Sequence, residues 1–166
     1  MNGRSYPVVL HDAEVMVNSL LKSSLMVEEN MLFPDMSDPL APPPPTIDYI
    51  ADVDTGSVFR STYHELCTEP NDVLCPLIMY LDRISIDLHG RCSLEPGYAT
   101  LGIRNLSTRN KAEAWRPLGY IPNLYLLSKN KNKLWMNSVT KLRMHHEIFY
   151  SFLSSVVKVQ RNGCLL

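Results

Sequence analysis

Hydrophobic side chains recur at helical spacing in two separate stretches of the first half of the chain. From Asp12 to Met26 the apolar positions form one stripe, and Asp12 stands where an N-cap is expected, so a helix is predicted there. A second, shorter helix is predicted to end before the turn residues 69–72. Its apolar positions are Phe59, Tyr63 and Leu66.

The middle of the chain has the patterns of three consecutive strands. Residues 77–81 form a continuous apolar run, which is typical of a strand covered on both faces, and residues 84–88 then alternate apolar and polar. After turn chemistry at 95–97, a second strand is predicted over 98–105 and a third over 115–124. Because short links join them, the three strands are expected to form an antiparallel meander.

The last part of the chain has one long helical pattern. A polar connection with helix-like content, 107–114, joins the second and third strands, and a basic loop follows at 128–133. From Leu134 to Val157 apolar residues recur at helical spacing, which predicts a long amphipathic helix that ends near Asn162–Gly163. The expected fold class is α/β (α+β), a three-stranded antiparallel meander followed by this helix.

Four consecutive prolines, residues 42–45, separate the N-terminal helix from the rest of the chain. Such a run lacks backbone donors and favours polyproline II, so we interpret it as a stiff linker. An SH3 or WW ligand is less favoured, because no flanking arginine is well placed. The sequence is thus divided into a helical, proline-rich arm (1–46), an acidic segment with a short helix (47–72) and a C-terminal domain (73–166).

Composition places the chain among globular proteins. It has 166 residues, 45% of them hydrophobic, and a mean hydropathy of -0.09, which excludes a disordered chain, a collagen-like repeat and a disulfide miniprotein. No apolar run approaches the roughly 20 residues that span a bilayer, and residues 1–10 do not form a signal peptide. We therefore expect an intracellular protein without a membrane partner.

The small net charge of -1 conceals a strong asymmetry between two halves. Residues 1–72 carry twelve acids against three bases, whereas residues 73–166 carry five acids against thirteen bases. This asymmetry is compatible with a nucleic-acid surface, with an acidic arm folded against a basic body, or with two solvated faces.

Few residues form a pattern with recognisable chemistry. The four cysteines include no C-x-x-C pair and are interpreted as small buried hydrophobes. The adjacent residues His145 and His146 point about 100° apart on a helix, which favours solvated or packed side chains over a metal site. No P-loop, G-x-G-x-x-G or G-x-S-x-G motif is present, so neither a cofactor nor a small-molecule substrate is expected.

Asp82 is the strongest candidate for chemistry, because it is an acid at the end of an apolar run. A buried carboxylate must be paired, hydrogen-bonded or bound to a cation. Asp82 could therefore be a metal ligand on a central strand. Composition alone favours the other interpretation, in which Asp82 pairs with Arg83, Arg91 or Arg104 or lies beyond the buried part of the strand. A two-metal site needs several carboxylates from separate elements, and the sequence shows no obvious companion for Asp82.

Basic residues of the second half are candidates for contact with a phosphate backbone. The predicted DNA-binding set is Arg104, Arg109, Lys111, Arg116, Lys129, Lys131 and Lys133. The same residues would also suit an ordinary basic surface.

Two stretches of sequence carry a resemblance to a known family. They are NMLFPDMSDPLAPPPPTIDYIADVDTGSVFRSTYHEL and VLCPLIMYLDRISIDLHGRCSLEPGYATLGIRNLSTRNKAEAWRPLGYIPN. The series of strand, Asp, turn, Leu-Glu-Pro, strand and Gly-Tyr-Ile-Pro resembles the Plavaka-type transposase-like proteins of mobile elements. The resemblance extends from about Glu28 to Gln160.

The resemblance implies an RNase H-like core of the DDE type. In such a core three antiparallel strands precede a helix, and a fourth strand then pairs in parallel beside the first. Asp82 matches the first acid of the triad, where an intact relative would bind Mg²⁺ for DNA cleavage and joining. The sequence reaches Leu166 without the second and third acids, so residues 73–166 are expected to form a truncated, partial RNase H-like domain.

The resemblance and the missing acids together predict the function. We expect a transposase remnant that is inactive by itself, with Asp82 a vestigial ligand and no cofactor of its own. It would be nuclear if the family role is retained, and DNA is its expected partner. The alternatives are a non-catalytic DNA-binding or protein-interaction module that uses the basic half, and an enzyme completed by a partner chain.

Overall fold

The computed structural model describes residues 8–32, 52–69, 72–85, 93–122 and 138–163. These residues form a mixed α/β protein with an open antiparallel sheet, as the sequence predicts at this coarse level. The predicted proline linker at 42–45 and the basic loop at 128–133 lie outside the described residues.

The chain divides into two compact units, each built from segments that are distant in the sequence. Unit 1 contains residues 1–19, 79–99 and 116–166, and unit 2 contains residues 20–78 and 100–115.

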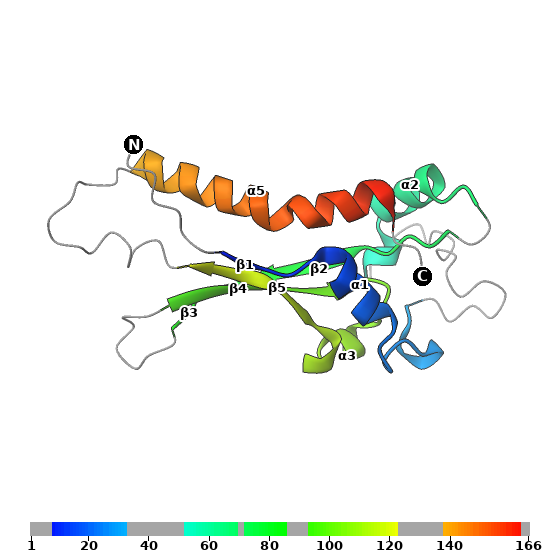
Figure 1. Ribbon diagram of the computed structural model, residues 1–166. Helices are drawn as coiled ribbons and strands as arrows, with labels where there is room; N and C mark the ends of the chain where they lie inside the picture. The colour runs from blue at the N-terminus through cyan, green and yellow to red at the C-terminus, as the bar shows by residue number, and fades with distance from the viewer. Residues whose placement is uncertain (1–7, 33–51, 70–71, 86–92, 123–137, 164–166) are drawn as a thin grey trace, which may run out of the picture. The chain divides into compact units, whose positions relative to one another are not determined.

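The sheet has the strand order β1-β5-β4-β2, with β3 pairing to β4 beside β2 (Figure 1). The strands are β1 (Val9–Leu10), β2 (Leu77–Leu81), β3 (Ile84–Ser85), β4 (Ser93–Leu101) and β5 (Arg116–Pro122). The antiparallel pairing of β4 with β5 matches the predicted second and third strands of the meander. Strand β1 is missing from the prediction, because two exposed residues carry no periodic signal.

Strand β4 begins earlier than predicted and includes residues 95–97, which we expected to form a turn. Pro96 pairs with Tyr120 and Gly97 with Gly119 inside the ladder, and the register shifts between Gly97 and Tyr98. Pairing to β5 thus overrides the local turn preference of Pro-Gly, and the irregularity is absorbed as a bulge.

The break between β2 and β3 has a physical cause in the opposite strand. Ile84 pairs with Leu94, and the same register two residues earlier sets Asp82 opposite Pro96. Because proline has no N–H to donate, the ladder is interrupted at this position. The run of residues 77–85 therefore forms two short strands instead of one.

Strand β2 differs from the prediction in its burial. Its apolar sequence predicts cover on both faces, but Met79, Tyr80 and Leu81 are exposed, as is Ile84 in β3. These apolar side chains are therefore not part of the core, and they are available for contact with another surface.

Helix α1 (Ala13–Leu21) begins where the sequence predicts, with Asp12 as its cap. The Oδ1 atom of Asp12 accepts hydrogen bonds from the N–H groups of Glu14 at 2.9 Å and Val15 at 3.1 Å. The helix ends at Leu21, earlier than the predicted Met26.

Each unit has its own buried apolar side chains. Those of unit 1 come from α1, β4 and β5 and are Ala13, Met16, Val17, Ala99, Leu118 and Ile121. Those of unit 2 are Leu20, Phe59, Leu101, Ile103 and Ala114. In unit 2, Gly102 donates from its N–H to the carbonyl of Pro76 at 2.6 Å. A Cβ at Gly102 would lie 3.0 Å from Pro76, so this close approach requires glycine.

The remaining elements of unit 2 are short. They are the 3-10 helix η1 (Glu28–Asn30), the 3-10 helix η2 (Val53–Thr55), helix α2 (Ser57–Leu66), helix α3 (Leu106–Arg109) and the 3-10 helix η3 (Ala112–Ala114). Helix α2 confirms the second predicted helix, and α3 with η3 confirms the helix-like connection at 107–114.

Helix α5 (Ser138–Asn162) belongs to unit 1 and contacts β5 there. It confirms the long predicted helix, and Gly163 ends it in the left-handed region at a φ of 68° with an N–H bond to the Val159 carbonyl. Within the described residues, no helix combines the length and apolarity that a membrane crossing requires.

Candidate functional site

Asp82 lies directly after β2 and is exposed to solvent. Its Oδ2 atom accepts a hydrogen bond from the hydroxyl of Tyr80 at 2.8 Å, and its Oδ1 atom accepts one from the N–H of Arg83 at 2.7 Å. Of the interpretations that the sequence left open, the structure supports a position beyond the buried part of the strand. Solvent and these two donors satisfy the carboxylate without a metal ion.

The contact with Asp82 also changes the acidity of Tyr80. The hydrogen bond that the phenol donates to Asp82 raises the pKa of Tyr80, and the negative charge of Asp82 adds to this effect. Both act because deprotonation of the phenol would remove a donor and place a second negative charge beside the carboxylate. Tyr80 and Asp82 therefore behave as one small polar pair on the surface of unit 1.

The described residues around Asp82 do not supply the set of carboxylates that a pair of magnesium ions requires. Two-metal sites hold their ions with several carboxylates from separate elements. Among the described residues, no three His, Cys, Asp or Glu side chains come together as a group that could hold an ion. The carboxylate of Asp82 therefore offers one ligand of the required set, and we derive no chemical step through a metal here.

Arg104 is a core residue of unit 2 and not the surface cation that we expected to face DNA. Its side chain is 0% exposed. The guanidinium donates to the carbonyl of Leu20 at 2.6 Å, to the carbonyl of Ala114 at 3.2 Å and to the hydroxyl of Ser23 at 3.0 Å. The cost of burying this charge is offset by hydrogen bonds to backbone acceptors, which leaves the guanidinium inaccessible to a phosphate.

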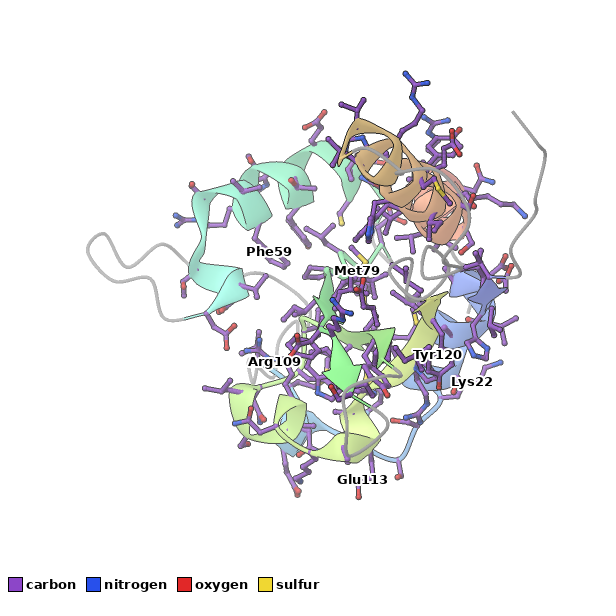
Figure 2. The ribbon with its side chains drawn as sticks, turned by 90° about the vertical axis from the view of Figure 1, so that its left-hand side faces the viewer. Lys22, Phe59, Met79, Arg109, Glu113 and Tyr120 are labelled. Carbon is purple, nitrogen blue, oxygen red and sulfur yellow. The ribbon has the colours of Figure 1, made fainter. Side chains whose placement is uncertain are left out.

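The other predicted DNA-binding residues are not brought together by the described part of the structure. In unit 2, Arg109, which is labelled in Figure 2, forms an ion pair with Asp52. Lys111 of the same unit is exposed. In unit 1, Arg116 donates from Nε to the hydroxyl of Ser19 at 3.2 Å. The three remaining members, Lys129, Lys131 and Lys133, lie outside the described residues.

The structure reveals a charged cluster that the sequence analysis missed, formed by Asp52, Asp54 and Arg109 in unit 2. Asp52 caps η2 by accepting from the N–H of Val53 at 2.7 Å, and Thr55 completes a capping box. The spacing Asp-x-x-Thr at 52–55 is a signal that could have identified this cap from sequence. The partner Arg109 is 57 residues away and has no local signal.

Asp54 is the buried member of this cluster. It is 6% exposed, and its Oδ1 atom has no hydrogen-bond partner among the described residues. Burial raises the pKa of Asp54 above its ordinary value of 3.8, and the nearby charge of Asp52 acts in the same direction. Backbone N–H groups and the charge of Arg109 oppose this shift only in part.

The remaining candidates show no chemistry. Cys67 and Cys75 are half-buried, whereas the sequence predicts fully buried small hydrophobes, and burial raises the pKa of Cys67. His145 and His146 lie on α5, and His146 is exposed.

Comparison with known proteins adds no relative. Scans against family models, curated proteins and solved structures found no match to this chain.

Proposed function

We propose that this chain is a transposase-related protein with a partial RNase H-like sheet that does not cut DNA by itself. The observation that carries the proposal is the strand order. Strands β2, β4 and β5 follow one another along the chain, lie side by side as β5-β4-β2, and are followed by the long helix α5. This is the arrangement that the sequence resemblance implies, with Asp82 directly after the first of the three strands.

The lack of catalysis follows from the number and setting of the acids. Phosphodiester cleavage by two metal ions needs carboxylates that converge on both ions. Asp82 is exposed and carries hydrogen bonds from Tyr80 and Arg83, and no group of potential ligands gathers beside it within the described residues. A single exposed carboxylate binds Mg²⁺ too weakly to position a nucleophile and a leaving group.

A plasmid-nicking assay tests this proposal. The full chain and the variant Asp82→Asn are incubated with supercoiled DNA and Mg²⁺ or Mn²⁺, with Glu147→Gln as a control for an exposed acid on another element. We expect equal, background-level nicking by all three proteins. Metal-dependent nicking that Asp82→Asn abolishes and Glu147→Gln retains would overturn the proposal.

The described residues give less support to a DNA-binding module built on the predicted basic set. Arg104 is buried and Arg109 is paired with Asp52, so Lys111 is the one fully exposed cation among the described members. Non-specific DNA binding needs several cations along one surface. The alternative of a protein-interaction module has a separate basis on α5.

A further inference from the structure

The apolar residues of helix α5 cover a wide sector of its circumference, and only one side of this sector is needed to pack against the sheet. One face includes the half-buried residues Ile148, Val156 and Val159, and the helix contacts β5 of the sheet in unit 1. The neighbouring side of the helix is more exposed and carries apolar residues in steps of three, four or eight. Its members are Val139, Leu142, Tyr150, Leu153 and Val157. We call this second set the outer stripe.

Four of the five residues of the outer stripe are exposed to solvent, and Leu153 is half-buried. Val139, Leu142, Tyr150 and Val157 are between 38% and 81% exposed, and Tyr150 is the most exposed of them. At these positions a helix that faces only water carries polar residues, because exposed apolar surface has no favourable contact there. An apolar row at helical spacing is the pattern by which one helix packs against another.

The stripe borders a hollow whose charge is positive. The hollow has a volume of about 510 Å³ and is lined by Tyr150, Leu153, Ser154, Val157, Lys158, Arg161 and Asn162. Lys158 and Arg161 are exposed, and no carboxylate is among these lining residues. Neither cation forms a salt bridge with an acid of the described residues. A partner that supplies carboxylates at this end would therefore gain ion pairs that the two cations do not form with the described residues.

We propose that the outer stripe of α5 binds an acidic amphipathic helix of a partner protein. Apolar side chains of that helix, spaced by three and four residues, would cover Tyr150, Leu153 and Val157. Its acidic side chains would face Lys158 and Arg161 at the C-terminal end of α5. This surface is independent of Asp82, so it goes beyond the proposed function and does not rest on it.

A second copy of the chain is a poorer occupant on electrostatic grounds. In an antiparallel pair of α5 helices centred on Tyr150, Lys158 and Arg161 of one copy would face the end of the other that carries Arg143. A parallel pair would place each of these cations beside its own equivalent. Both arrangements bring like charges together, which opposes self-association.

DNA is also a poorer occupant than an acidic helix. Phosphates would suit Lys158 and Arg161, but the centre of the stripe is occupied by Tyr150, Leu153 and Val157. Burying these side chains against a phosphate backbone would gain little, because it is hydrated and charged. An apolar surface flanked by cations fits a ligand with apolar and acidic groups together.

The test is a binding titration of the full chain with two labelled helical peptides. Both carry leucine at successive third and fourth positions, one with glutamate and the other with lysine on the flanks. We expect the glutamate peptide to bind in the micromolar range and the lysine peptide at least about tenfold more weakly. Equal affinity for the two peptides, or no binding of either, would overturn the proposal.

Matched variants locate the binding surface. Lys158→Glu combined with Arg161→Glu, and separately Tyr150→Ser combined with Val157→Ser, should each weaken binding by about tenfold or more. Lys111→Glu and Val58→Ser change equally exposed residues on other elements, at 76% exposure for Val58, and should stay within about twofold. Circular dichroism verifies that each variant is folded.

Two further measurements test the alternative ligands of this face, which are DNA and a second copy of the chain. The first measurement is binding of a DNA duplex. Tight binding that Lys158→Glu with Arg161→Glu abolishes, but Tyr150→Ser with Val157→Ser does not change, would show that this face binds nucleic acid. A dimer in sedimentation experiments that Tyr150→Ser with Val157→Ser dissociates would make it a self-association surface. Either result overturns the proposed acidic-helix partner.

Discussion

The two units differ in which side chains they bury. Unit 2 has charged side chains in its interior, whereas unit 1 has apolar side chains on its surface. In unit 2 the guanidinium of Arg104 lies in the core, and Arg109 and Asp52 are paired at side-chain exposures of 11% and 18%. In unit 1 the apolar residues of β2 and the outer stripe of α5 face solvent. Arg104, Arg109 and Asp52 of unit 2 have partners within the chain, whereas these apolar surfaces of unit 1 do not have cover among the described residues.

This contrast changes which residues should be tested for function. Charge alone suggests that arginines face a ligand, but the cost of burying Arg104 is offset by acceptors inside the fold. Hydrophobicity alone suggests that residues 77–81 are core, but Met79, Tyr80 and Leu81 are exposed. Some charged residues of this chain thus stabilise the fold, and some apolar residues form its candidate binding surfaces.

Replacing Arg104 with methionine should have the largest effect on stability. The variant would leave the buried carbonyls of Leu20 and Ala114 without their present donor. We expect the free energy of unfolding in urea to fall by about 3–4 kcal/mol, because each buried polar group without a partner costs about 1–3 kcal/mol.

Lys111→Met is the matched control for Arg104→Met, because Lys111 is an exposed cation in the same unit. Its unfolding free energy should change by less than about 0.5 kcal/mol. If Arg104→Met were as stable as Lys111→Met, the guanidinium would not be structural and the predicted role in DNA binding would regain support.

Asp52→Asn should weaken the pairing of η2 with α3 in unit 2 by a smaller amount. Asparagine keeps an oxygen that can cap the N–H of Val53, but it removes the charge that Arg109 faces. We expect a loss of about 2 kcal/mol in the free energy of unfolding, since both side chains are mostly buried.

A double-mutant cycle with Arg109→Gln measures the pairing energy of Asp52 and Arg109 directly. The coupling should account for most of the loss in Asp52→Asn. Additive single effects would show instead that the loss in Asp52→Asn does not come from its ion pair with Arg109.

The sequence predicted the elements better than it predicted their surroundings. Helices α1, α2 and α5 and the strands β2, β4 and β5 were identified because periodicity is a local property. Residues 95–97 were misassigned because pairing of β4 to β5 is not local and overrides the turn preference of Pro-Gly. Strand β1 was missed because only its pairing with β5 defines it.

The prediction of site residues was limited because the sequence does not show which charged side chains are buried or which partners they have. Asp82 was singled out as an acid ending an apolar run, but the sequence did not show that it is exposed and accepts a hydrogen bond from Tyr80. Arg104 resembled the other cations of its segment, because its acceptor at Leu20 is 84 residues away. Asp54 looked like one more member of an acidic stretch, although it is the buried one.

Asp54→Asn should stabilise the protein at neutral pH, in contrast to Asp52→Asn. Because the pKa of Asp54 is raised in the folded state, the folded protein binds a proton at Asp54 more tightly than the unfolded chain does. The stabilisation that results is fully present below the ordinary pKa of 3.8. That contribution is lost as the pH rises through the raised pKa, so the ionised group opposes folding at pH 7. We expect Asp54→Asn to gain about 1 kcal/mol at pH 7.

Urea unfolding of wild type and Asp54→Asn from pH 3 to pH 7 verifies the sign. The stability difference between the two proteins should shrink towards acid pH, where Asp54 is protonated in both folded and unfolded states. A difference that stays constant over this range would assign the effect to packing instead of charge.

Tyr80 and Asp82 provide the smallest and most local measurement, because both are exposed and their contact hardly affects stability. The pKa of the Tyr80 phenol, followed by NMR of ring-labelled tyrosine and assigned with Tyr80→Phe, should lie above its ordinary value of 10.0 in wild type. In Asp82→Asn it should fall towards that value, because the charge that opposes deprotonation is gone. Millimolar Mg²⁺ should leave the wild-type pKa unchanged, since one exposed carboxylate is a poor site for the ion. If Mg²⁺ lowered the pKa of Tyr80 in the wild type but not in Asp82→Asn, Asp82 would be shown to bind the ion. The surface of unit 1 would then contain a metal ligand as well as an apolar binding face.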